Sequence, residues 1–105
     1  MRDAVRRHEP FAVSAITLLE IAVLFGTGTT QSGIALDKIL EELNSNPDFR
    51  IIPFTVDIAA EVAAVGPSLR DPSDRAIVST ARVEKLKLVT SDQRIIDSGL
   101  VPVVV

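Results

Sequence analysis

The sequence contains no cysteine, no tryptophan, no tyrosine and only one histidine among its 105 residues. The lack of cysteine excludes disulfides, thiolate nucleophiles and zinc sites built from thiolates. A single histidine, His8, leaves carboxylates as the available metal ligands, and carboxylates favour Mg²⁺ or Mn²⁺ over zinc. Apolar residues make up 47% of the chain but only four are aromatic, so the core is expected to be aliphatic.

The chain also lacks a long apolar run and an excess of positive charge. No segment is long and apolar enough to span a bilayer, and the charged first residues do not form an apolar leader. These features predict a cytoplasmic protein without membrane contact. The formal net charge is −3, whereas a protein that binds nucleic acid through bulk charge is expected to be basic. Any nucleic-acid partner would therefore be bound locally or through metal ions.

The length of 105 residues predicts a single domain over residues 1–105. Short apolar strands are expected at residues 11–14, 51–54, 86–90 and 101–105. The proline in each of the segments 51–54 and 101–105 places those strands at sheet edges. Helices are expected at residues 15–25, 34–43, 56–65, 72–85 and 93–97, with the end of a charged helix at 1–9 and a loop at 26–33. Strands that alternate with helices predict an α/β fold with a parallel sheet covered on both faces.

The stretch from Asp71 to Ile95 carries most of the polar signals. Asp71 is the expected N-cap of a helix, Pro72 its first residue, and Asp74 lies in its first turn. A short apolar strand follows, and Asp92 comes just after it. Because ligands of open α/β sheets bind outside the carboxyl ends of the strands, Asp92 is a candidate site residue.

Glu20 is the one charge in the apolar helix expected at residues 15–25. Apolar side chains cover nearly the whole circumference of this helix, which predicts that the helix is buried. A lone ionised carboxylate in such surroundings is costly unless it is paired, hydrogen-bonded or bound to a metal.

Each of these acids also has an explanation that involves no site. Asp71 and Asp92 could be helix caps, and Asp74 could be the return partner of a capping box. Glu20 could pair with Arg75 or Arg94, or reach solvent. If the acids instead converge in one crevice, a divalent cation would neutralise them and could activate water for phosphodiester cleavage. Arg75 and Arg94 could then line a path for an RNA backbone, or simply belong to a solvated surface.

Three segments in series resemble motifs of the PIN domain, and most closely those of VapC-type toxins of toxin–antitoxin pairs: Val13–Ala22, Asp71–Ala81 and Leu88–Ile95. The resemblance implies an endoribonuclease that depends on Mg²⁺ or Mn²⁺. It assigns Glu20, Asp74 and Asp92 as catalytic acids and metal ligands, with Asp71 as a neighbouring ligand. It further implies an RNA substrate, a small antitoxin partner and a homodimer.

The chain departs from the PIN pattern at its start. The family begins with an apolar central strand that ends in an aspartate, and residues 1–9 contain no such strand. We therefore expect an N-terminally incomplete sheet, with a slot between the strands at 11–14 and 86–90, and weakened metal binding. The strand could be missing through truncation, be supplied by another chain, or be lost in an inactive relative. Two other functions remain open: a catalytically inactive PIN-like module that binds an arginine-rich partner, and a purely structural α/β domain.

Overall fold

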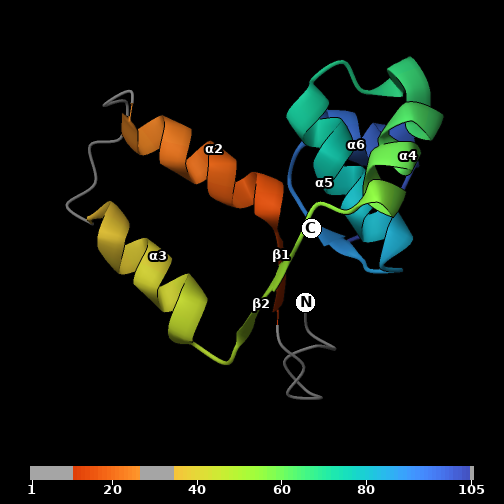
Figure 1. The fold of residues 1–105 in the computed structure, drawn as a ribbon. Helices are drawn as coiled ribbons and strands as arrows, with labels where there is room; N and C mark the ends of the chain where they lie inside the picture. Colours follow the sequence, from red (N-terminus) through yellow and green to blue (C-terminus); the bar gives the residue numbers. More distant parts are fainter. Residues whose placement is uncertain (1–10, 27–34, 105) are drawn as a thin grey trace. The chain divides into compact units, whose positions relative to one another are not determined.

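The computed structural model describes residues 11–26 and 35–104 and divides the chain into two compact units, Arg2–Pro53 and Phe54–Val105. The expected helix end at 1–9 and most of the expected loop at 26–33 lie outside the described residues. The α/β class is confirmed, because helices alternate with short parallel strands in both units (Figure 1). No helix in the described ranges is long and apolar enough to cross a membrane.

The N-terminal unit contains two parallel strands, β1 (Phe11–Ser14) and β2 (Phe49–Ile52). The register pairs Phe11 with Phe49 and Ser14 with Ile52. Helix α2 (Ala15–Gly26) follows β1 directly, and the Ser14 hydroxyl accepts a hydrogen bond from the Ile16 amide at 3.1 Å. This bond satisfies one of the free amides at the start of α2. The chain returns to the sheet through α3 (Leu36–Ser45), which packs against β2 (Figure 1).

The prediction that helix 15–25 is buried is wrong for the described residues. None of the side chains of α2 is buried, and Leu19, Val23 and Leu24 are each more than half exposed. The apolar sequence explains the discrepancy: a helix without a polar face is expected to be covered on all sides, but the described part of its unit contains one strand pair and one further helix to cover it. Glu20 is accordingly only half-buried, and the residue has an interaction partner.

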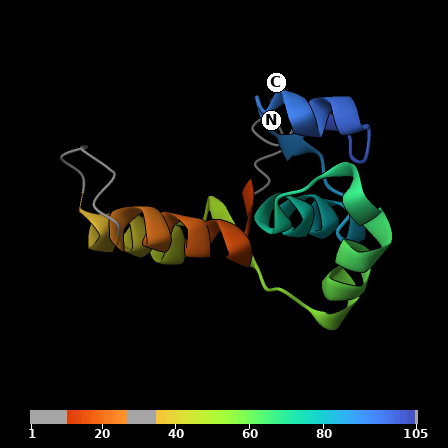
Figure 2. The same ribbon diagram turned by 90° about the horizontal axis from the view of Figure 1, so that it is seen from above.

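The C-terminal unit begins with α4 (Val56–Val65) and a 3-10 turn at Gly66–Ser68, followed by α5 (Pro72–Val83), β3 (Leu88–Val89), α6 (Gln93–Ser98) and β4 (Val103–Val104). Helix α5 lies between α4 and α6 (Figure 2). The core of this unit consists of aliphatic residues from α5, α6 and the adjoining loops: Leu69, Val78, Ala81, Ile95 and Val101. Strands β3 and β4 pair in parallel, with Leu88 beside Val103.

Several element bounds differ from the expected ones by a few residues. Strand β2 ends at Ile52, before Pro53, because proline has no amide hydrogen for the ladder. Helix α3 begins two residues later than expected and ends at Ser45. Helix α5 ends at Val83 rather than Lys85, because Lys85 has a positive φ of 57° that no helical residue adopts. Strands β3 and β4 are each two residues long, shorter than the apolar runs that contain them.

Within the described residues, β1 pairs with β2 and β3 pairs with β4, giving two separate two-stranded sheets. No other described strand pairs with β1 or β3. The sequence predicts one sheet, with a slot where a central strand is missing. That the two strand pairs belong to such a sheet therefore remains a prediction.

Candidate functional site

Asp71 and Asp74 lie at the amino end of α5. The Asp71 carboxylate accepts a hydrogen bond from the Ser73 amide at 2.8 Å, which confirms its expected role as the N-cap. Asp74 follows in the first turn, and its side chain is only 16% exposed. The sequence left open whether Asp74 is the return partner of a capping box or a site residue. In the described chain its side chain forms an ion pair with Arg94.

Asp92 is the N-cap of α6 and follows β3 along the chain. Its carboxylate accepts a hydrogen bond from the Arg94 amide at 2.9 Å, and its own amide donates to the Thr90 hydroxyl at 3.0 Å. Asp92 can therefore be both a helix cap and a site residue. Capping uses one oxygen of its carboxylate, and the carboxylate still lies just after strand β3. Thr90, which sequence analysis did not single out, fixes the backbone at this point.

Arg94 connects Asp74 and Asp92. Its Nε donates to Asp92 Oδ1 at 3.2 Å and its Nη2 to Asp92 Oδ2 at 2.9 Å, while Nη2 lies 3.5 Å from Asp74 Oδ2. The structure therefore brings two of the predicted acids to one guanidinium group. We refer to Asp71, Asp74, Asp92 and Arg94 as the acidic cluster. In the sequence, the two-residue spacing of Asp92 and Arg94 at a helix start could have indicated this two-pronged hydrogen bonding.

The electrostatics of the acidic cluster distinguish its carboxylates. Burial raises the pKa of Asp74, with a further increase from Asp71 and Asp92 and an opposing effect of Arg94. Hydrogen bonds from Arg94 lower the pKa of Asp92. Asp74 is thus a desolvated carboxyl beside like charges, an arrangement found at functional sites and in structural ion-pair networks alike.

Glu20 and Arg75, the remaining predicted residues, are not members of the acidic cluster. Glu20 belongs to the N-terminal unit and the acidic cluster to the C-terminal unit, so the expected convergence of Glu20 on Asp74 and Asp92 stays a prediction. Arg75 is half-buried, and its Nε donates to the Leu69 carbonyl at 2.5 Å, which ties α5 to the loop before it. Arg75 thus has a structural partner, and a contact with RNA remains a prediction.

The described residues contain no group of three or more acidic, histidine or cysteine side chains close enough to hold a metal ion. The two carboxylates of Asp74 and Asp92 nevertheless suit Mg²⁺, which commonly keeps several waters and uses one or two protein carboxylates. Their oxygens already face a single positive group in Arg94. This donor set fits a hydrated divalent ion and does not by itself form a closed metal cage.

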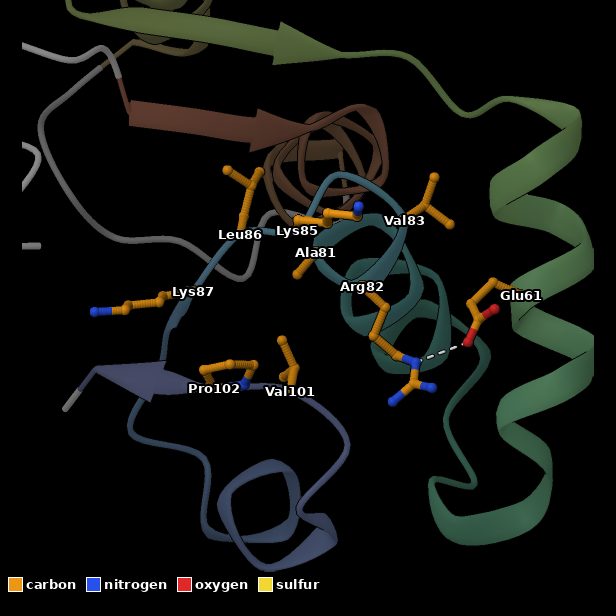
Figure 3. Close-up of a pocket in the computed structure, with 9 residues that line it drawn as sticks. All are labelled: Glu61, Ala81, Arg82, Val83, Lys85, Leu86, Lys87, Val101 and Pro102. Atoms are coloured by element: carbon orange, nitrogen blue, oxygen red, sulfur yellow. Dashed lines mark hydrogen bonds and ion pairs between the residues drawn. The ribbon is translucent and has the colours of Figure 1, made fainter.

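A pocket of about 530 Å³ lies at the opposite, carboxyl end of α5 (Figure 3). Apolar side chains such as Leu86 and Val101 line it together with Arg82, Lys85 and Lys87. The guanidinium of Arg82 is held by Glu61, with Nε 2.7 Å from Glu61 Oε1. A helix of twelve residues is about 18 Å long, so these basic residues are well separated from the acidic cluster at the amino end.

The comparisons with known proteins agree with this fold. The model of the PIN domain family matches residues 1–99. The structure of VapBC2 from Rickettsia felis, bound to a DNA fragment from its promoter, is similar with a TM-score of 0.72 and 18% identity, over 97% of this chain and 79% of that chain. The structure of FitAcB from Neisseria gonorrhoeae is similar with a TM-score of 0.62 and 27% identity, over 86% and 70%.

A comparison with curated protein sequences gives no significant match. The family match extends over both units of the structure and includes all three motifs that suggested it. The chain therefore belongs to the PIN domain family.

Proposed function

We propose that this chain is a metal-dependent endoribonuclease of the toxin type, active in the cytoplasm with Mg²⁺ or Mn²⁺. The observation that carries the proposal is the meeting of Asp74 and Asp92 on one cationic group at the amino end of α5, in a chain of the PIN family. The similarity to VapBC2 and FitAcB supports a toxin that is paired with an antitoxin.

In this proposal Glu20, Asp74 and Asp92 hold the metal, with Asp71 beside them. A bound divalent ion would lower the pKa of the attacking water and stabilise the negative charge on the phosphoryl group. Asp74 and Asp92 would also orient the water, since a hydrogen bond holds Asp92 at the start of α6 and the largely buried Asp74 is paired with Arg94. Arg75 and Arg94 would steady the phosphate of the RNA. We further propose a homodimer.

The test is cleavage of a labelled single-stranded RNA by the purified chain, with Mn²⁺, with Mg²⁺ and with EDTA. Cleavage should require the metal. Glu20→Gln and Asp74→Asn should each lower the rate by about 100-fold. Asp97→Asn provides a matched control, because Asp97 is an exposed acid of α6 that contacts Gln93. Loss of activity in the control as well, or full activity in EDTA, would rule out the proposed site.

The alternative is a catalytically inactive module that uses the same acids to bind an arginine-rich partner segment. The contact of Asp74 and Asp92 with a guanidinium group favours this alternative, since an arginine from a partner could be held in the same way. The two functions differ in their response to metal. If Mn²⁺ does not raise the melting temperature of the chain, the binding module is favoured.

A further inference from the structure

Arg94 contacts two of the three carboxylates of the acidic cluster, those of Asp74 and Asp92. Both carboxylate oxygens of Asp92 accept hydrogen bonds from the Arg94 side chain, and Oδ1 also accepts one from the Arg94 backbone amide. The same Nη2 that donates to Asp92 reaches Asp74. The guanidinium group is therefore shared between two acids from two different helices, α5 and α6.

This position has a physical reason. Two carboxylates in close proximity repel each other, and partial burial of Asp74 increases the cost of its charge. A positive group between them offsets that cost. The carboxylate oxygens that accept hydrogen bonds from Arg94 are also the oxygens that a hard divalent cation would ligate. A cation and the guanidinium group would therefore compete for the same lone pairs.

The Arg94 side chain is also able to leave. It is 71% exposed, and ion pairs of exposed side chains are weak because water and salt screen them. The side chain projects from the first turn of α6, where its backbone amide remains fixed by Asp92. Departure of the guanidinium group would thus leave the cap of α6 intact.

We infer that Arg94 is an internal counter-cation of the acidic cluster, which a divalent metal ion has to displace in order to bind. The inference rests on the proposed function, because it assumes that the metal is bound by Asp74 and Asp92. It adds that the apparent metal affinity depends on the exchange of the Arg94 guanidinium group for the metal ion. Arg94 is then a positioning residue, which holds the carboxylates in the metal-free state.

The first experiment measures the binding of Mn²⁺ alone by isothermal titration calorimetry. Arg94→Gln should lower the apparent Kd by about three- to fivefold, the range expected for loss of an exposed ion pair. Arg94→Lys should give a smaller change, since an ammonium group keeps the charge but cannot form the fork. Arg70→Gln is the matched control: Arg70 is exposed, adjoins Asp71 in the chain and carries the same charge, and its removal should leave the Kd nearly unchanged.

The second experiment observes Arg94 directly, by the nuclear magnetic resonance signal of its Nε–Hε group during addition of diamagnetic Mg²⁺. The signal should move to the position of a solvated arginine as the site fills. If the wild-type chain binds metal but Arg94→Gln binds no more tightly and the signal stays in place, the inference is wrong and the proposed function stands. Equal tightening by Arg70→Gln would reduce the effect to net charge and also overturn the inference. Absence of metal binding in both the wild type and Arg94→Gln would overturn the proposed function together with it.

Discussion

At the scale of single residues, the structure separates acids that the sequence treats alike. Asp71 and Asp92 are caps with specific amide donors, whereas Asp74 is a partly buried carboxyl whose pKa is raised by burial and by its acidic neighbours. A carboxyl that is harder to ionise in the folded chain than in the unfolded chain lowers stability when it is charged. The charged form of Asp74 therefore lowers the stability of the metal-free folded chain.

Asp74→Asn should therefore stabilise the metal-free chain at neutral pH. The raised pKa means that the wild-type chain loses stability as the pH rises from the ordinary aspartate value of 3.8 through the folded-state pKa of Asp74. The difference in melting temperature between variant and wild type should be present at pH 7 and disappear near pH 3.8. Thermal unfolding in EDTA across this range measures it. Asp97→Asn serves as the control, because Asp97 is exposed. If Asp74→Asn changed the melting temperature by the same amount at all pH values, the raised pKa of Asp74 would be contradicted.

Ser79 gives a second prediction at this scale. Its side chain is fully buried in α5, and its hydroxyl has no hydrogen-bond partner in the described structure. Because an unpaired buried hydroxyl costs about 1–3 kcal/mol and alanine is the better helix former, Ser79→Ala should raise the free energy of unfolding by about 1 kcal/mol. Urea unfolding provides the measurement.

The neighbouring Thr80 is the matched control for Ser79. Its hydroxyl is also buried but donates to the Ala76 carbonyl at 2.7 Å. Thr80→Ala should lower stability, since it removes a satisfied group and its packing. Destabilisation by Ser79→Ala to the same extent would show that the Ser79 hydroxyl is paired.

At the scale of elements, helix ends account for most of the local structure. Thr55 caps α4 by accepting from the Ile58 amide at 3.2 Å, and Gly99 ends α6 in the left-handed conformation. The end of α5 differs, because the left-handed position after it is occupied by Lys85 rather than by glycine. A residue with a β-carbon is strained in this conformation.

Lys85→Gly should consequently stabilise the chain by about 0.5–1 kcal/mol, the strain released being larger than the entropy that glycine adds to the unfolded state. Lys85→Ala removes the same charge but keeps the β-carbon, so it should bring no such gain. Comparison of the two variants by urea unfolding separates the backbone effect from the charge effect. Equal stability of the two would refute the interpretation of strain.

At the scale of the whole molecule, charge and sheet pairing are the informative properties. The net charge of −3 gives no general attraction for nucleic acid, and the basic residues near the pocket of α5 lie away from the acidic cluster. The described strands form two pairs rather than one continuous sheet. Two-stranded sheets are marginal alone, so each pair depends on the helices that pack on it.

The charge balance predicts that RNA binding depends on the divalent ion. Fluorescence anisotropy with a cleavage-resistant phosphorothioate RNA should show binding in Mn²⁺ that weakens by about tenfold or more in EDTA, because the carboxylates then repel the phosphates. Added NaCl at constant Mn²⁺ is the control for general screening. Binding that is unchanged by EDTA but lost in salt would indicate a basic surface instead.

The sequence by itself determined the class of fold, the family motifs and most helix starts. Helix starts were predictable because a cap such as Asp71 or Thr55 acts within three residues, and local chemistry fixes it. The roles of Asp71 and Asp92 as caps followed from the same rule. The candidate acids could be named, but their mutual distances depend on contacts between residues far apart in the chain.

Only the tertiary structure decided the rest. It showed that α2 is partly exposed despite its apolar sequence, since burial depends on how many elements are present to cover a helix. It placed Asp74 and Asp92 on the same guanidinium group of Arg94, a pairing across two helices that packing of Val78 and Ile95 in one core brings about. Helices and their caps depend on residues that are close in the sequence. The electrostatic environment of a carboxylate such as Asp74 depends on residues that are distant in the sequence and close only in the folded chain.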